Sequence, residues 1–148
     1  MASLPHVLFL DSAQQGGQLG RYSFLAADPF HWIERTSEQI VCSLDPRIAQ
    51  SSEQIVSSLD PRIERTSSFS DPFSEVDRLW RTYPTETSPG LPPFQGGLAG
   101  LFGYDLARSL ERLPASKMDD LPTPSLALGC YDVVIAVDHG QGECWIIS

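Results

Sequence analysis

The sequence predicts an α+β domain with a largely antiparallel sheet and a few short helices, and three observations carry this prediction. Residues 126–148 read LALGCYDVVIAVD, then HGQG, then ECWIIS. Two β-branched runs around a four-residue, glycine-containing turn are typical of a hairpin. Apolar and polar residues alternate in part over 21–30, which indicates another strand. A helix signal begins at Asp71.

Length and composition fit one globular domain covering residues 1–148. Of the 148 residues, 41% are hydrophobic and 20% are charged, which is ordinary for such a domain. The net charge of −9 argues against a nucleic-acid partner, because phosphate binding needs clustered Lys and Arg. No apolar run approaches the roughly 18–20 residues that span a bilayer, and the start lacks a signal-peptide pattern. We therefore expect a cytoplasmic protein without membrane contact.

The first elements are two strands. Residues 6–12 (HVLFLDS) form a short apolar run that predicts a buried strand, and the QQGGQLG after it predicts a loop. The second strand, within 21–30, should stop at Asp28-Pro29.

An internal repeat lies within residues 34–63. SEQIVCSLDPRI at 37–48 recurs as SEQIVSSLDPRI at 52–63, with eleven of twelve positions identical. Two copies are too few for a solenoid, whereas loops tolerate insertions because closure entropy grows slowly with length. We expect a tandem duplication in a surface loop, in which one copy supplies a strand and the other bulges out.

The clearest helix lies downstream of the repeat. Asp71 can cap its start, Pro72 suits its first position, and the helix should end near Tyr83-Pro84. Its apolar residues at helical spacing are Phe73, Val76, Leu79 and Trp80.

Glycines concentrate in FQGGLAGLFGYDLARSLERLP, at 94–114. The start of this segment predicts a strand that buries Leu98, Leu101, Phe102 and Tyr104, and DLARSLERL predicts a short helix with Leu106 and Leu110 on one face. No Gly-Lys-Ser/Thr or GxGxxG pattern is present, so close packing between strands is favoured over phosphate binding.

Residue spacing alone indicates no catalytic or metal site. The three cysteines have no CxxC pair and are expected to be unpaired thiols, with two of them on strands: Cys42, Cys130 and Cys144. The three histidines share no metal-ligand spacing, and nothing ties them to a serine and an acid as in a hydrolase triad: His6, His31 and His139.

Residue identity goes further than spacing. PPFQGGLAGLFGYDLARSLERLP, at 92–114, closely resembles a segment of aminodeoxychorismate synthase component I, and residues 121–139 resemble the next segment of that family. FLDS at 9–12 resembles the LLES-type motif of the superfamily, and GRYSFLAADP at 20–29 resembles its next strand. Anthranilate synthase component I shares this layout, but its glycine segment reads nearer to GGxxGYxxYD. The LFGY at 101–104 therefore favours the aminodeoxychorismate branch.

The resemblance implies the fold of the superfamily's amino-terminal, non-catalytic domain. The complete enzyme would convert chorismate and ammonia, delivered by a glutamine amidotransferase subunit, into 4-amino-4-deoxychorismate for folate synthesis. Its catalytic residues and its magnesium belong to a carboxy-terminal chorismate-binding domain that has no counterpart here. No catalytic residue and no cofactor are therefore expected in this chain.

The resemblance also implies a tryptophan site, because the superfamily's amino-terminal domain binds tryptophan. The matching residues are Ser12, Leu19, Gly20, Arg21 and Tyr22. Ser12 can instead cap a turn, and Tyr22 can instead pack in the sheet. Two features depart from the family: Asp11 replaces the glutamate of the LLES-type motif, and the repeat lengthens a loop. The alternatives that remain are an enzyme fragment of either branch, a free-standing amino-acid-binding regulator, and the degenerate product of a duplicated or broken gene.

Overall fold

A computed structural model describes most of the chain. The described residues are 4–12, 20–36, 40–44, 63–67, 71–114 and 123–148. The chain divides into two compact units, whose ranges are Met1–Phe30, Tyr83–Ala99 and Gly129–Ser148 for unit 1, and His31–Thr82 and Gly100–Leu128 for unit 2. Among the described residues no helix is long and apolar enough to cross a membrane.

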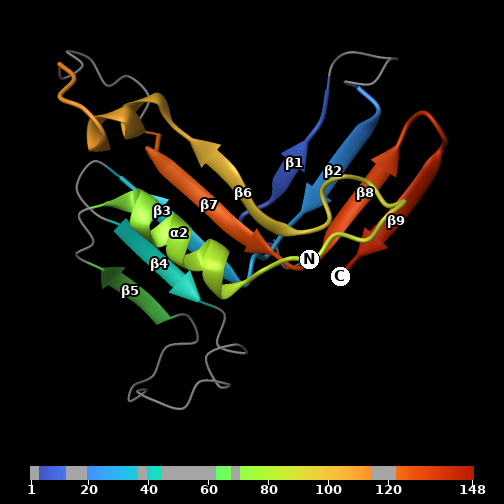
Figure 1. Cartoon of the computed structure of the whole chain (residues 1–148), viewed down its shortest axis with the longest axis horizontal. Helices are drawn as coiled ribbons and strands as arrows, with labels where there is room; N and C mark the ends of the chain where they lie inside the picture. The colour runs from blue at the N-terminus through green and yellow to red at the C-terminus, as the bar shows by residue number, and fades with distance from the viewer. Residues whose placement is uncertain (1–3, 13–19, 37–39, 45–62, 68–70, 115–122) are drawn as a thin grey trace. The chain divides into compact units, whose positions relative to one another are not determined.

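Unit 1 is built on a four-stranded antiparallel sheet. Its strand order is β1 (Leu8–Leu10), β2 (Tyr22–Ala26), β8 (Val134–Asp138) and β9 (Glu143–Ile147) (Figure 1). The predicted hairpin is confirmed, because β8 and β9 pair in register across the four-residue turn. Ala26, Tyr131 and Val134 are the buried residues of the core, and Phe24 and Phe94 pack against them. The rings of Phe24 and Phe94 meet edge to face.

The predicted buried strand at the start of the chain is only partly correct. β1 exists, but it is three residues long, and Phe9 and Leu10 are 64% and 42% exposed. β1 is an edge strand of its sheet. An edge strand has a neighbour on one side only, so its apolar side chains find fewer contacts than those of a central strand.

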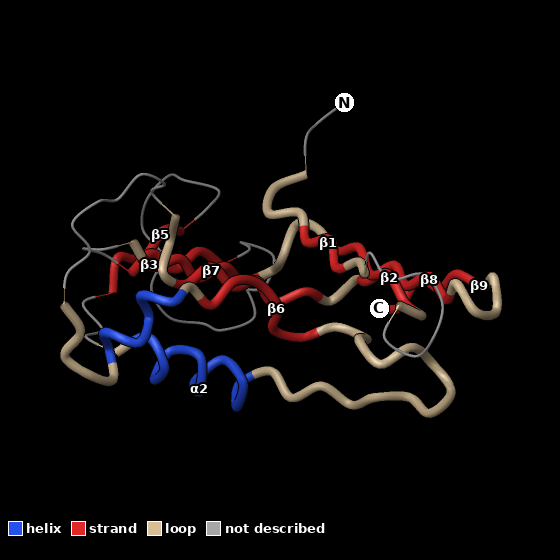
Figure 2. Tube along the Cα trace, turned by 90° about the horizontal axis from the view of Figure 1, so that it is seen from above, coloured by secondary structure: helices blue, strands red, loops and turns tan. Residues whose placement is uncertain are grey.

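The second sheet has the order β5 (Ile63–Ser67), β4 (Ile40–Leu44), β3 (His31–Arg35), β7 (Leu126–Tyr131) and β6 (Gly97–Phe102). Helix α2 (Pro72–Thr82) runs along one face of strands β3 and β4 in unit 2, as Figures 1 and 2 show from two directions. The core of unit 2 contains Ile33, Leu79, Leu126 and Leu128, all at most 1% exposed. Together the two sheets confirm the predicted α+β class.

The start of α2 confirms its predicted cap. The carboxylate of Asp71 accepts hydrogen bonds from the backbone amides of Phe73 and Ser74, at 3.1 and 3.2 Å. These bonds satisfy amides that have no partner within the helix. Leu79 is buried as expected, but Trp80 is 67% exposed, so the apolar face is narrower than the spacing predicted.

The first copy of the repeat forms a strand. β4 lies within residues 37–48 and pairs with β3 on one side and β5 on the other. Residues 52–62 of the second copy lie outside the described residues, and so does the predicted bulge. β3 and β5 were not predicted as strands, although both contain the sequence Ile-Glu-Arg.

The glycine segment forms β6 and a short 3-10 helix (Tyr104–Ser109). Close strand packing is borne out at Gly100, where an added Cβ would lie 2.1 Å from the carbonyl oxygen of Ala127 on β7. Leu106 is buried. Leu98 is half-buried. The burial predictions for four other side chains are wrong, because these are between 46% and 90% exposed: Leu101, Phe102, Tyr104 and Leu110. A 3-10 helix has three residues per turn, so residues four apart do not share a face as they would in an α-helix.

Candidate functional site

The residues expected to hold tryptophan lie at one end of the β1–β2 pair in unit 1. The register pairs Leu10 with Phe24, and Ser12 follows the end of β1 by two residues. Gly20 and Arg21 immediately precede β2. Leu19 lies outside the described residues. The structure therefore brings four of the five expected residues to one sheet end.

Arg21 is held against the turn between β8 and β9. Its Nε and Nη2 both donate to Oδ2 of Asp138, at 2.9 and 2.6 Å. Its guanidinium carbon lies 4.9 Å from the centroid of the Tyr22 ring, within reach of a cation–π interaction. The Asp138 side chain is 1% exposed and that of Arg21 is 39% exposed. The guanidinium thus already has a buried carboxylate partner.

Asp138 organises this turn. Its other oxygen, Oδ1, accepts hydrogen bonds from the backbone amides of Gly140 and Gln141, at 2.8 and 3.2 Å. The hydrogen bonds from Arg21, followed by those from the two amides, lower the pKa of Asp138 below its usual value. The amide of His139 also donates to the carbonyl of Arg21, at 2.8 Å. These contacts fasten the start of β2 to the end of β8.

A second polar cluster lies beside this pair, around the hydroxyl of Ser23. Ser23 Oγ donates to Oδ1 of Asp11 at 2.6 Å and lies 2.6 Å from Nε2 of His139. The hydrogen bond from Ser23, and then that from the backbone amide of Ser12, lower the pKa of Asp11. Nothing in the sequence indicated this contact between a histidine, a serine and an acid. The three residues are far apart in sequence, and only the pairing of β2 with β1 and β8 brings them together.

The order of contacts in this cluster differs from that of a hydrolase triad. In a triad the imidazole lies between the serine and the acid, and it takes the serine proton. Here the hydroxyl lies between the carboxylate and the imidazole, and its proton is donated to Asp11. Ser23 is also 8% exposed. The cluster therefore fits a hydrogen-bonded support for the sheet end better than a nucleophile.

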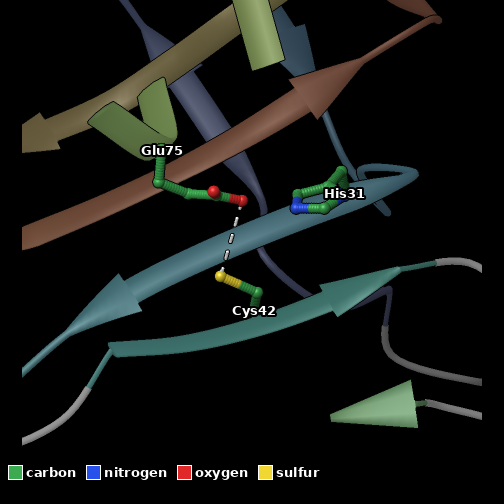
Figure 3. A group of neighbouring side chains, drawn as sticks. All are labelled: His31, Cys42 and Glu75. Atoms are coloured by element: carbon green, nitrogen blue, oxygen red, sulfur yellow. Dashed lines mark hydrogen bonds between the residues drawn. The ribbon is translucent and has the colours of Figure 1, made fainter. Parts of the chain in front are cut away.

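Unit 2 contains a cluster that the sequence did not indicate. His31 on β3, Cys42 on β4 and Glu75 in the first turn of α2 are all buried, and their side-chain donor atoms lie within 4.8 Å of one another (Figure 3). Burial, and then the charge of Arg78, lower the pKa of His31 to about 4, although Glu75 opposes the shift. The imidazole is therefore neutral at neutral pH. Because three elements contribute one residue each, no sequence spacing could reveal the cluster.

Known proteins similar to this chain are component 1 subunits of two synthases. Anthranilate synthase component 1 of Mycobacterium tuberculosis (strain ATCC 25618 / H37Rv) is 32% identical over 151 residues, covering 99% of this chain and 26% of the relative. Aminodeoxychorismate synthase component 1 of Escherichia coli (strain K12) is 31% identical over 149 residues, covering 100% of this chain and 29% of the relative. The chain thus spans less than a third of the length of these relatives. No family model matches the chain.

The fold resembles that of a solved structure. The crystal structure of anthranilate synthase component I from Streptococcus pneumoniae TIGR4 superimposes with a TM-score of 0.55 over 93% of this chain and 26% of that one. Sequence identity in this superposition is 20%, so the likeness concerns the fold. The sequence comparisons confirm the resemblance found in the sequence motifs, and the superposition agrees with the fold that this resemblance implies.

Proposed function

We propose that this chain is the amino-terminal, non-catalytic part of an aminodeoxychorismate synthase component 1. The premise is its homology with component 1 of the anthranilate and aminodeoxychorismate synthases. The observation that carries the choice of branch is the segment FQGGLAGLFGYDL at 94–106. Overall identity does not separate the two branches, because it is 32% to one relative and 31% to the other.

In this proposal the complete enzyme makes 4-amino-4-deoxychorismate from chorismate and from ammonia supplied by a glutamine amidotransferase subunit. This chain supplies a folded support, and the chorismate chemistry belongs to a catalytic domain with its magnesium. The clusters in unit 1 agree with a supporting role, because Arg21 and Ser23 are both engaged by buried or neighbouring acids. The isolated chain, incubated with chorismate, magnesium and ammonium, should form neither aminodeoxychorismate nor anthranilate. Turnover above background would contradict the assignment as a non-catalytic part.

Two chimeras test the branch. In one, this chain replaces the aligned region of the Escherichia coli relative, and in the other it replaces the aligned region of the Mycobacterium tuberculosis relative. Each is assayed with chorismate, magnesium and ammonium for the product that its relative's name specifies. The aminodeoxychorismate chimera should retain activity and the anthranilate chimera should lose it. The reverse result would assign the chain to the anthranilate branch.

A tryptophan site at the end of β1 and β2 is the second part of the proposal. Ser12, Gly20, Arg21 and Tyr22 lie at this sheet end, and Leu19 joins them by resemblance. Since Arg21 is engaged by Asp138, the Ser12 hydroxyl and strand-end backbone groups would hold the amino acid's polar groups, and apolar neighbours would contact the indole.

Calorimetry with tryptophan tests this site. We expect binding by the unmodified chain that Ser12→Ala abolishes. Ser43→Ala is the matched control, because Ser43 lies on β4 in unit 2 and should leave binding unchanged. No binding by the unmodified chain, or binding that survives Ser12→Ala, would refute the site.

A further inference from the structure

The His31 side chain has no polar partner in a buried position. The residue is 6% exposed, and neither Nδ1 nor Nε2 makes a hydrogen bond. Buried polar groups in folded proteins are nearly always satisfied, and each exception calls for an explanation. An imidazole with both nitrogens unsatisfied is an exception of this kind.

The neighbours of His31 are the two side chains that could share a ligand with it. Sγ of Cys42 lies 3.9 Å from Oε1 of Glu75, at the outer limit of a weak hydrogen bond, and Figure 3 shows the His31 ring directed toward this pair. A Cys–Glu hydrogen bond would account for the thiol and the carboxylate. It would leave the imidazole unexplained, because the ring makes no hydrogen bond to either of them.

A tetrahedral metal ion explains all three side chains together. Zinc binds thiolate sulfur, imidazole nitrogen and carboxylate oxygen at distances that place a sulfur and an oxygen ligand about 3.6 Å apart. The observed separation of 3.9 Å is close to this value, and all the donor atoms already lie within 4.8 Å. Small side-chain rotations would therefore complete the ligand set, and a water molecule could take the fourth position.

The negative charges of the cluster favour a divalent cation among its three side chains. The Glu75 carboxylate and a Cys42 thiolate together carry two negative charges, which a divalent ion neutralises inside the core. Arg78 Nε donates to Oε2 of Glu75 at 2.9 Å, and its Nη2 donates to Oε1. The Arg78 side chain is 50% exposed, so its own charge remains hydrated. Its hydrogen bonds hold the carboxylate in position, as outer-shell partners of metal ligands commonly do.

We propose that His31, Cys42 and Glu75 form a binding site for a divalent zinc-type cation. The mixed nitrogen, sulfur and oxygen donor set suits zinc better than calcium or magnesium, which prefer oxygen ligands alone. The bound ion ties α2 to β3 and β4 and acts as a structural element of unit 2. The site is independent of the proposed synthase role, since all its ligands come from unit 2.

Cobalt and zinc titrations of the full, chelator-treated chain test the site. Cobalt bound through a cysteine gives a thiolate charge-transfer band, and zinc should remove that band at one equivalent per chain. Loss of a group that merely orients a metal ligand costs about 10- to 100-fold in affinity, so Cys42→Ser should weaken zinc binding by more than that and should abolish the band. Cys144→Ser is the matched control, because it makes the same change at an exposed cysteine of β9 in unit 1.

A second variant keeps the test decisive if Cys42→Ser does not fold. Combined Cys130→Ala and Cys144→Ser substitutions leave Cys42 as the sole cysteine of the chain. The thiolate band should persist in this variant. The proposal would be overturned if the band were absent from this double variant or were lost in Cys144→Ser alone. A lack of zinc binding by the unmodified chain would also overturn it.

Discussion

Gly100→Ala tests the close approach of β6 to β7. The Cβ of an alanine here would lie 2.1 Å from the carbonyl oxygen of Ala127 and 3.0 Å from Cα of Leu128. Both contacts are with backbone atoms of a buried strand, so no side-chain rotation can relieve them. The strands would have to separate by about 1 Å in a close-packed interior. Gly100 also has a φ of +152°, which an alanine rarely adopts.

The expected cost combines these two effects. Overpacking of a core costs about 1–3 kcal/mol, and an unfavourable backbone conformation costs about 1–3 kcal/mol. We expect Gly100→Ala to lower the free energy of unfolding by about 3 kcal/mol, which is a large part of the roughly 5–15 kcal/mol that stabilises a domain. The melting temperature should fall by roughly 10 °C for a chain of this size.

Urea unfolding followed by circular dichroism measures the change, with Gly142→Ala as the matched control. Gly142 also has a positive φ, of +69°, but an added Cβ there meets no atom within 4 Å. The control therefore carries the backbone cost without the clash and should lose only about 1 kcal/mol. Equal stability of the two variants would show that β6 does not approach β7 this closely, and the packing explanation of the glycine segment would fail.

Three further predictions concern the core, the repeat and acid stability. Leu79→Ala should cost about 3 kcal/mol, because Leu79 is 1% exposed, whereas Trp80→Ala, at a 67% exposed position, should cost less than about 1 kcal/mol in the same urea experiment. Deletion of residues 49–63 should leave the urea midpoint unchanged or slightly raised, and a loss of several kcal/mol would show that both copies are structural. The pKa of Asp138 is lower in the folded chain than the usual 3.8, chiefly through Arg21. Its stabilising effect is therefore complete above that value and is lost as the pH falls below it. Asp138→Asn should flatten the dependence of the urea midpoint on pH between about 5 and 2, and an unchanged dependence would contradict the assigned pair.

Local signals predicted the fold well where one segment decides the structure. The β8–β9 hairpin and the Asp71 cap depend on residues within a few positions of each other, and both are present. Burial was predicted less well, because an apolar side chain is buried only if another element covers it. Phe102 and Tyr104 are as apolar as the pattern required, yet they are 55% and 90% exposed.

The clusters could not be predicted from spacing, because their members come from distant parts of the chain. Arg21 and Asp138 are separated by 117 positions. The motif resemblance predicted Arg21 as a tryptophan-site residue, but nothing near it in sequence indicated the acid that would engage it. Pairing of β2 with β8 creates that contact, so the chemistry of the sheet end is a property of the topology.

The repeat involves both local sequence signals and contacts between distant residues. Its copies differ only where Cys42 in the first is matched by Ser57 in the second, and the first copy forms β4. Deletion of 37–51 and deletion of 49–63 yield two chains of equal length that are identical except for serine or cysteine at this position. The two repeat copies have nearly the same strand propensity, because they differ at one position only. Either chain can therefore form the strand between β3 and β5. Only the chain that lacks residues 49–63 retains the thiol of Cys42. The copy that forms the strand therefore decides whether His31 and Glu75 have a third metal ligand.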